Sequence, residues 1–275
     1  MKKNTLRKFL LYMANIIISL IIAFPFIWLV ITSLKTYDQI YSFPILYWPK
    51  EVTFEHYAHI MKLNFPRYFF NSAFIGFGTA LFTILIAIMP AYASARYNFK
   101  GKKQIMLSIL FSQMFPQIIF VIPFFIILKQ LNLQNSYLGI MISYLPFTTP
   151  IAVWMMRSFF LQLPDELEEA AMIDGCNRFE SFYKIYVPLA VPGIASVGIY
   201  AFLFSWSELM FSMSYLSAKS MQTVPVFLSL FIGQYQTRWG PLFAGSIVAA
   251  IPPMIVFALL QRYFIQGLTS GAVKD

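Results

Sequence analysis

Acidic side chains are concentrated in residues 163–188, LPDELEEAAMIDGCNRFESFYKIYVP, called the acidic stretch below. Its first part has no basic residue and carries five carboxylates, those of Asp165, Glu166, Glu168, Glu169 and Asp174. Ala170 and Ala171 leave the same segment flat enough for close approach by another protein. Carboxylates on such a surface suit ion pairs with a basic groove of a partner, which is contact chemistry and not catalysis. On composition alone, a solvated amphipathic loop is the alternative interpretation.

Two short helices are predicted within the acidic stretch. Pro164 suits the first turn of a helix, and Gly175 suits the left-handed residue that ends one. Asn177 followed by Glu180 is a capping pair, which predicts that a second helix begins there and runs to residue 187, just before Pro188. The stretch is therefore expected to present a short acidic helix, followed directly by a second helix that returns toward an apolar run.

The remainder of the chain has the composition of a helical membrane protein. Of its 275 residues, 59% are hydrophobic and only 11% are charged, a balance that is typical of membrane proteins and not of soluble domains. Charge-free runs long enough for the ~20 residues that cross a bilayer predict six transmembrane helices, at about residues 10–31, 68–95, 104–128, 134–156, 188–212 and 240–262. Because a bilayer cannot satisfy exposed backbone groups, we predict an all-α integral membrane protein, with residues 1–275 as one transmembrane domain.

The basic residues predict the orientation of these helices. With both termini inside the cell (N-in/C-in), 13 of the 20 Lys and Arg residues fall on the cytoplasmic side, as the positive-inside rule expects. The acidic stretch then lies in a cytoplasmic loop, residues 157–187, while residues 33–67 and 213–238 form extracellular loops. The net charge of +9 is scattered in short clusters at the ends of apolar runs, so no nucleic-acid partner is predicted.

Other kinds of site find little support in the sequence. There is no G-x-x-x-x-G-K-[ST] motif, so the chain cannot hold a nucleotide in a P-loop, and no catalytic residue is predicted. His56 and His59 have no third ligand, so no metal site is expected. Glu208 is the exception to spans that otherwise lack ionisable groups. It either lines an outer vestibule or marks a helix end, and both interpretations stay open.

The spacing in the acidic stretch resembles the cytoplasmic loop of permease subunits of binding-protein-dependent ABC importers. The family pattern is Glu-Ala-Ala, three residues, Gly, nine residues, Ile, one residue, an aliphatic and Pro, which here corresponds to Glu169, Ala170, Ala171, Gly175, Ile185, Val187 and Pro188. Valine stands where leucine is usual in the aliphatic position. The tail at residues 261–274 and the segments 204–211 and 239–250 are similar to those of maltose-type carbohydrate-uptake permeases, specifically the smaller six-helix partner of the pair.

The resemblance implies a type I ABC importer permease fold and a set of partners. These are a second homologous permease, two ATP-binding subunits, an extracellular sugar-binding protein and the surrounding membrane lipid. ATP and Mg²⁺ would bind to the ATPase subunits, and no cofactor would bind to this chain. The chain would be a multi-pass protein in the cell membrane of a bacterium or archaeon.

Residue roles are implied by the same resemblance. The loop residues that match the family pattern would dock the ATPase subunit, with Glu169 facing a basic residue there and Gly175 turning the chain back toward the membrane. The tail residues Gly267, Thr269 and Gly271 would also contact the ATPase subunits.

The expected substrate is a di- or oligosaccharide. Residues suited to a sugar along the pathway are Gln113, Tyr144, Trp206 and Glu208. Packing or interface roles are the alternative for each of them, and the partner permease alone could hold the substrate. The alternative function for the whole chain is a nucleotide-independent channel or secondary carrier. A structural scaffold has no positive feature in the sequence.

Overall fold

The structure is a computed structural model that describes the backbone of residues 2–269 and the side chains of residues 8–259 and 261. No strand forms among the described residues, where β-type pairing is limited to the isolated bridges Lys35–Val52 and Ile232–Thr237. The all-helical fold predicted from the sequence is confirmed. The chain divides into two compact units: unit 1 holds Met1–Pro66 and Phe227–Ile251, and unit 2 holds Arg67–Val226 and Pro252–Asp275.

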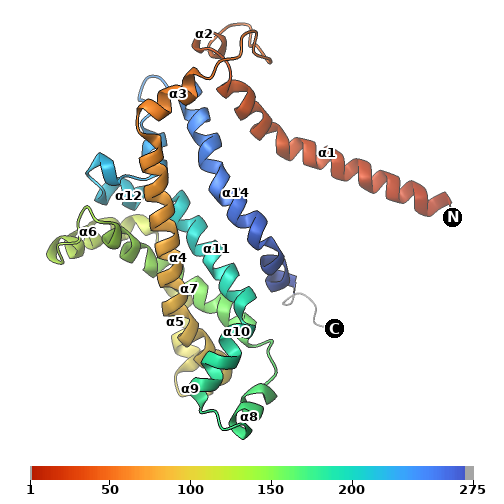
Figure 1. Ribbon diagram of the computed structural model, residues 1–275, viewed down its shortest axis with the longest axis vertical. Helices are drawn as coiled ribbons and strands as arrows, with labels where there is room; N and C mark the ends of the chain where they lie inside the picture. The colour runs from red at the N-terminus through yellow and green to blue at the C-terminus, as the bar shows by residue number, and fades with distance from the viewer. Residues whose placement is uncertain (1, 270–275) are drawn as a thin grey trace. The chain divides into compact units, whose positions relative to one another are not determined.

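Four helices are long and apolar enough to cross a membrane (Figure 1). They lie within α1 (Lys2–Ser33), α4 (Phe65–Arg96), α7 (Tyr137–Phe160) and α14 (Trp239–Thr269). Two further pairs of helices meet the same criteria if each pair is taken as one bent span, which gives up to six. The chain is therefore an integral membrane protein with four to six candidate spans.

The first bent pair replaces the single helix predicted at residues 104–128. Here α5 (Lys102–Ser112) is followed by the 3-10 turn η1 (Gln117–Phe120) and by α6 (Val121–Gln130), and the two parts meet at 91° (Figure 1). Pro116 explains the interruption. It has no backbone N–H to continue α5, and its ring disfavours helical geometry at the residue before it.

The helix predicted at residues 188–212 is shorter in the structure, and the second bent pair lies at its start. The helix α11 (Val191–Ser207) stops before Glu208, whose backbone is extended (φ −75°, ψ 126°), and α12 (Met210–Tyr215) begins two residues later. On the other side of α11, the chain arrives through α9 (Arg178–Ser181), the π-helix η2 (Phe182–Tyr186) and α10 (Val187–Leu189), with a bend of 71°.

Unit 1 contains most of the predicted extracellular loop at residues 33–67, which forms the short helices α2 (Tyr37–Ile40) and α3 (Glu55–Lys62). Lys35 is buried there. Its ammonium donates to the Leu46 carbonyl and lies 4.4 Å from the centre of the Trp28 ring, and burial lowers the pKa of this group. His56 Nε2 lies 2.9 Å from the Lys35 carbonyl oxygen. These contacts fix α3 to the segment that follows α1.

An apolar run that begins at Val224 lies in the predicted extracellular loop at residues 213–238. It forms the short helix α13 (Val224–Ser229), preceded by the 3-10 turn η3 (Lys219–Met221). Val224 and Phe227 are buried, and the Phe227 ring packs edge-on against Phe65 at 5.1 Å within unit 1. The helix therefore contributes to the protein core instead of lying on its surface.

The core of unit 2 forms where α7 packs along α11. Ala152, Met156 and Phe160 of α7 belong to a buried cluster that also contains Tyr92 of α4 and Tyr186 of η2. A hydrogen bond of 2.7 Å between the buried hydroxyls of Thr83 and Thr148 joins α4 to α7. Because this cluster includes residues from the acidic stretch, the core fixes the stretch to the ends of two membrane-spanning helices.

The start of α7 gives a test of the fold. Ser136 Oγ accepts the N–H of Gly139 at 3.0 Å, so Ser136→Ala should lower the free energy of unfolding by about 1 kcal/mol. Ser158→Ala is the matched control, because the Ser158 hydroxyl donates to Trp154 O on the exposed side of the same helix; its effect should stay within about 0.5 kcal/mol. Denaturation of the purified chain in detergent, followed by circular dichroism, measures both. Equal losses would contradict the capping role.

Candidate functional site

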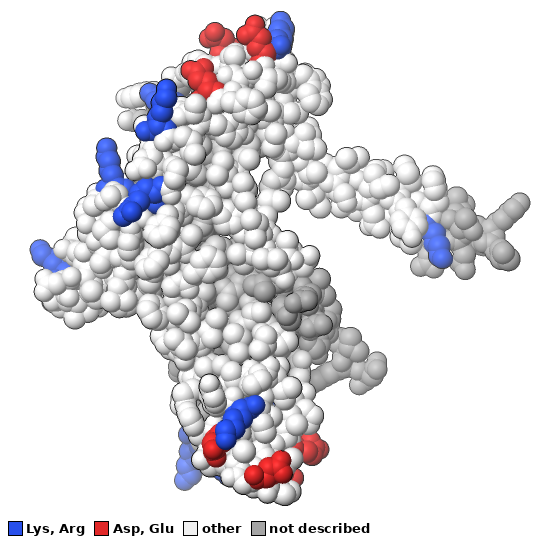
Figure 2. Space-filling model, in the orientation of Figure 1, with Lys and Arg blue, Asp and Glu red and all other residues white. Residues whose placement is uncertain are grey.

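The acidic stretch folds into a short helix, α8 (Glu166–Ile173), at one end of unit 2. On the face shown in Figure 2, the acidic side chains of unit 2 gather at this end. The outward side of α8 follows the helical spacing i, i+3, i+4, i+7 and consists of the exposed residues Glu166, Glu169, Ala170 and Ile173. Ile173 is 85% exposed, whereas Ala171 is buried and Leu167 packs on the core of unit 2. The helix is held by one side and presents carboxylates and an isoleucine on the other.

The chain turns sharply after α8, as Gly175 predicted. Cys176 N donates to Ala171 O at 2.9 Å and Gly175 N donates to Met172 O at 3.1 Å, the two bonds of a Schellman motif. Gly175 has φ +85°, where L side chains are disfavoured. A Cβ at this position would meet no atom within 4 Å, so the backbone conformation, and not lack of space, requires glycine.

The second helix begins with the capping pair predicted from the sequence. Glu180 N donates to Asn177 Oδ1, and Asn177 N donates to Glu180 Oε2, both at 2.9 Å. The helix then continues through η2 into α10, and so past the predicted end at residue 187. Pro188 cannot donate to a carbonyl four residues earlier, and the wider π turn lies at that place. Ile185 is half-buried and Pro188 is exposed.

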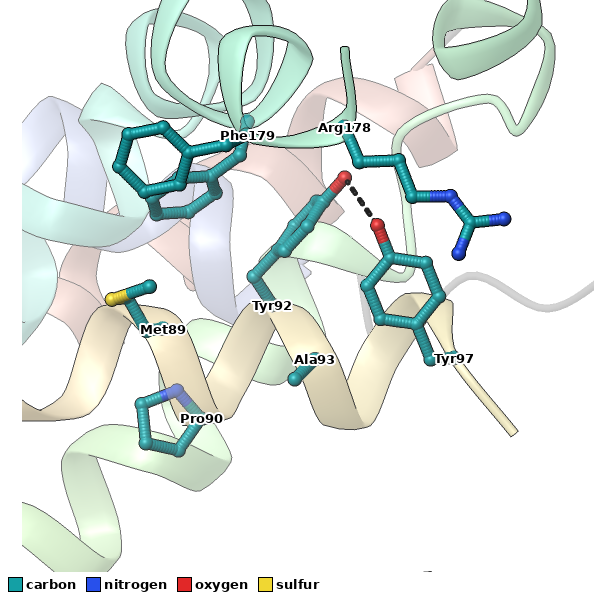
Figure 3. A pocket seen from close by; sticks show the side chains of 8 residues that line it. Met89, Pro90, Tyr92, Ala93, Tyr97, Arg178 and Phe179 are labelled. Carbon is teal, nitrogen blue, oxygen red and sulfur yellow. Dashed lines mark hydrogen bonds between the residues drawn. The ribbon is translucent and has the colours of Figure 1, made fainter. Parts of the chain in front are cut away.

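A cavity of about 460 Å³ opens between α4 and the second helix (Figure 3). Met89, Pro90 and Ala93 line it from α4, and Phe179 and Phe182 line it from the acidic stretch. The wall is mostly apolar, which is a poor match for a polyhydroxylated sugar. The cavity therefore leaves space beside the acidic stretch without forming the predicted substrate site.

Tyr97 joins the end of α4 to α8. Its hydroxyl lies 3.5 Å from the Tyr92 hydroxyl (Figure 3) and donates to Glu168 Oε1 at 3.1 Å. Arg178 Nε lies 3.7 Å from the same Glu168 oxygen, and the guanidinium lies 5.4 Å from the centre of the Tyr97 ring. The Arg178 side chain is 70% exposed, so its ion pair contributes little to stability.

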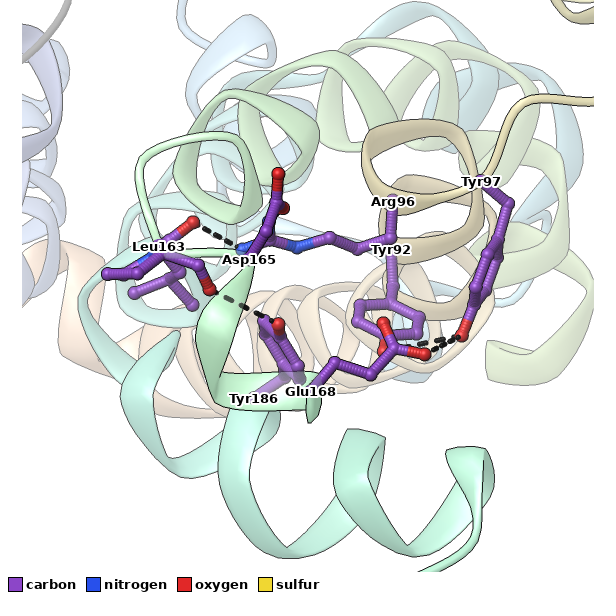
Figure 4. Close-up of polar contacts among 8 residues, drawn as sticks. Tyr92, Arg96, Tyr97, Leu163, Asp165, Glu168 and Tyr186 are labelled. Atoms are coloured by element: carbon purple, nitrogen blue, oxygen red, sulfur yellow. Dashed lines mark hydrogen bonds and ion pairs between the residues drawn. The ribbon is translucent and has the colours of Figure 1, made fainter. Parts of the chain in front are cut away.

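Arg96, in the last turn of α4, contacts the acidic stretch at three places (Figure 4). Its guanidinium donates to the Leu163 carbonyl, pairs with the Asp165 carboxylate, and lies 4.7 Å from the centre of the Tyr186 ring. The Arg96 side chain is only 5% exposed, while Asp165 is 90% exposed. One buried cation thus contacts the segment before α8, the N-cap residue of α8 and the π-helix η2.

Two residues of the predicted substrate pathway meet inside unit 2. Tyr144 and Glu208 are both buried, and the Tyr144 hydroxyl donates to Glu208 Oε2 at 2.8 Å. The Glu208 carboxylate also accepts the N–H groups of Phe211 (2.8 Å) and Ser212 (3.1 Å) in the first turn of α12. Glu208 is therefore satisfied within the chain. Of its two interpretations, these contacts favour the marker of a helix end.

The other predicted residues lie apart from this pair or beyond the described side chains. Trp206 is buried and stacks on Phe202 at 5.5 Å, and half-buried Gln113 donates to Pro146 O at 3.4 Å. In the tail, Gly267 and Thr269 lie in the last turn of α14, where side chains are not described, and Gly271 lies outside the described residues. The pathway and tail assignments stay predictions.

Sequence reasoning missed Arg96 and Tyr97. In the sequence, Arg96 is one of the 13 basic residues for which the positive-inside rule predicts the cytoplasmic side. An arginine directly after a long apolar helix is expected wherever such a helix ends on the cytoplasmic side. The partner of Arg96, Asp165, lies 69 residues away. The sequence held no signal that separates this buried arginine from the exposed lysines of the same turn.

The chain is similar to known membrane transport proteins over almost its whole length. A family model described as "Binding-protein-dependent transport system inner membrane component" matches residues 83–270, a segment that includes α8 and its anchors. The chain is 34% identical to the trehalose/maltose transport system permease protein MalG of Thermococcus litoralis, covering 100% of this chain and 99% of that protein. It is 35% identical to the trehalose transport system permease protein SugB of Mycobacterium tuberculosis, covering 91% and 92%.

The fold has a counterpart among solved structures. A crystal structure of a bacterial ABC transporter involved in the import of the acidic polysaccharide alginate contains a chain that matches with a TM-score of 0.78. The match covers 96% of this chain and 98% of the other, at 23% identity. The likeness at this level of identity concerns the fold.

The anchoring role of Arg96 can be tested by Arg96→Lys, which keeps the charge but loses the planar group that reaches two acceptors at once. The free energy of unfolding should fall by about 1–3 kcal/mol, the range for a hydrogen bond to a charged group. Arg178→Lys, at the exposed ion pair with Glu168 within the acidic stretch, should change it by less than about 0.5 kcal/mol. Chemical denaturation measures both, and limited proteolysis should show faster cleavage within residues 161–177 for Arg96→Lys alone. The same rate in both variants would argue against the anchor.

The helix break at Glu208 gives a separate test. Tyr144→Phe leaves the buried Glu208 carboxylate without one donor and should lower the free energy of unfolding by about 1–3 kcal/mol. Tyr200→Phe is the control, since the Tyr200 hydroxyl makes a longer bond of 3.3 Å to the neutral Phe147 carbonyl; a loss of about 1 kcal/mol or less is expected. If thermal unfolding shows the larger loss for Tyr200→Phe, the role assigned to the Tyr144–Glu208 bond is wrong.

Proposed function

The chain belongs to the family of inner membrane components of binding-protein-dependent transport systems, and we propose that it is the permease subunit of an ATP-driven sugar importer. The observation that carries this proposal is the outward side of α8, where Glu166, Glu169 and Ile173 are exposed in a loop with the Glu-Ala-Ala spacing of such permeases. The names of the trehalose/maltose and trehalose permeases that the chain resembles support a di- or oligosaccharide as substrate.

The complete transporter contains several other chains. A second, homologous permease forms the other half of the translocation pathway, and an extracellular binding protein delivers the sugar. Two ATP-binding subunits hold ATP and Mg²⁺, because this chain has no P-loop of its own. The outward side of α8 docks to one of these subunits, with Glu169 facing a basic residue, and the tail residues Gly267, Thr269 and Gly271 contact them as well.

The orientation is part of the proposal. Counting each bent pair as one span gives six spans, and an even number returns the chain to the side from which it started. Arg96, Arg157 and Arg178 lie near the end of unit 2 that carries α8, and the positive-inside rule favours the cytoplasm for this end. The chain then lies N-in/C-in in the cell membrane of a bacterium or archaeon.

The anchoring of α8 explains how movement of the ATPase subunits reaches the membrane. Leu167 and Ala171 pack α8 onto unit 2, Arg96 fixes its N-terminal end to α4, and Tyr97 fixes Glu168. A displacement of α8 therefore moves the ends of α4 and α7 with it, as a rigid-body switch requires. Closure of the ATPase subunits would in this way reorient the pathway between its two open states.

Burial supports different roles for the four predicted pathway residues. Gln113 is half-buried at the end of α5, and we keep it as a candidate contact with the sugar. Tyr144, Trp206 and Glu208 are buried among protein groups. Their contribution to the pathway is therefore to hold α11 and α12 in position around it.

The docking role is tested by Glu169→Lys in the complex reconstituted with its partner permease, ATPase subunits and binding protein. Reversing one partner of a desolvated charge pair costs about 2–5 kcal/mol, so sugar-stimulated ATP hydrolysis and uptake should fall by at least about 30-fold. Gly175→Asp should uncouple transport too, because it strains the turn after α8. Glu51→Lys, at an exposed position on the opposite side in this orientation, should leave both rates unchanged.

Maltose, trehalose and longer oligosaccharides form the substrate panel for the same assay. Normal transport by an intact Glu169→Lys complex would contradict the docking role. Uptake that proceeds without ATP would identify a channel or secondary carrier instead of an ATP-driven importer.

A further inference from the structure

A second cavity in unit 2, of about 480 Å³, lies at the turn between α4 and α5. Three cationic side chains line it, those of Lys102, Lys103 and Arg157, and no acidic side chain does. Within the part of the chain that the structure describes, none of the three forms an ion pair with a carboxylate. The cavity therefore carries an unbalanced positive charge, and an anion is its electrostatic complement.

Two of the three cations of this cavity form hydrogen bonds to backbone carbonyls. Lys102 Nζ donates to Tyr97 O at 3.1 Å, and Arg157 Nε donates to Ser94 O at 3.3 Å. Gly101 precedes α5 with φ +87°, and no side chain caps that helix of 11 residues. The N–H groups of its first turn add partial positive charge to the same cavity.

Apart from Asn98 and Gln104, the side chains of the remaining wall are apolar. Phe99, Met106, Leu107 and Trp154 line it, and Phe99 and Leu107 are exposed on the protein surface. An inorganic phosphate ion would gain nothing from these apolar side chains. A lipid would use both parts, with its phosphate at the cations and the first part of an acyl chain along the apolar side chains, at the ends of the membrane-spanning helices α4 and α7.

We propose that this cavity binds the headgroup of an anionic phospholipid, such as phosphatidylglycerol, from the cytoplasmic leaflet. The inference rests on the proposed orientation, which puts residues 97–103 on the cytoplasmic side. The bound lipid would also affect the acidic stretch. Arg157 donates a hydrogen bond to the Ser94 carbonyl, and Ser94 lies two residues before Arg96, which contacts the stretch. Lipid at this site would hold α7 against the same turn of α4 that anchors α8.

The test is a titration of the complete transporter in detergent with phosphatidylglycerol, with the retained lipid counted by native mass spectrometry. Lys103→Gln should weaken binding about five-fold, and Lys102→Gln combined with Lys103→Gln about 25-fold, from the typical contribution of each lysine near an anionic lipid surface. Lys100→Gln is the matched control. It removes the same charge from the same turn, at an exposed residue that does not line the cavity, and should change binding less than about two-fold.

Three results would overturn the site. Equal weakening by Lys100→Gln would show a general attraction of the turn for acidic lipid, and unchanged retention in the double variant would show that the cations do not hold the lipid. Displacement of the lipid by inorganic phosphate would show a site for free anions. The lipid count does not depend on transport, so a complex that retains the lipid at this site but imports no sugar would refute the proposed function and leave this inference standing.

Discussion

A buried guanidinium is the constraint on which the candidate docking site depends. The Arg96 side chain is 5% exposed at the end of α4, and a cation so enclosed needs acceptors nearby, because leaving it unpaired costs several kcal/mol. The acidic stretch supplies the Leu163 carbonyl, the Asp165 carboxylate and the face of the Tyr186 ring. Asp165 itself is 90% exposed and would be solvated without its partner. The position of α8 is thus imposed from the side of the membrane-spanning helices.

Two basic residues near this end of unit 2 have structural roles. Arg96 and Arg157 both act on the last turns of α4, Arg96 through its own side chain and Arg157 through the Ser94 carbonyl. The two arginines connect α4 to the acidic stretch and to α7. A docking helix can transmit movement only if it is attached in this way, because a helix on a free loop would move without its neighbours.

The sequence predicted features that depend on near neighbours and missed those that depend on distant ones. The turn at Gly175 and the capping pair of Asn177 and Glu180 are fixed within a few residues, and the structure confirms both. Pro90 stays inside α4 while Pro116 interrupts a helix, and the difference depends on neighbours that a sequence does not place. The break at Glu208 depends on Tyr144, which is 64 residues away. Arg96 was visible as a charge but not as an anchor, for the same reason.

The exposure of the outward side of α8 has a consequence for a copy of the chain that has not yet assembled with partners. Ile173 is 85% exposed beside Glu166 and Glu169, so under the proposed docking role a newly made copy presents this apolar side chain uncovered. Under the proposed docking role, the same few residues would be uncovered in an unassembled copy and covered in an assembled one, so their exposure would differ between the two states.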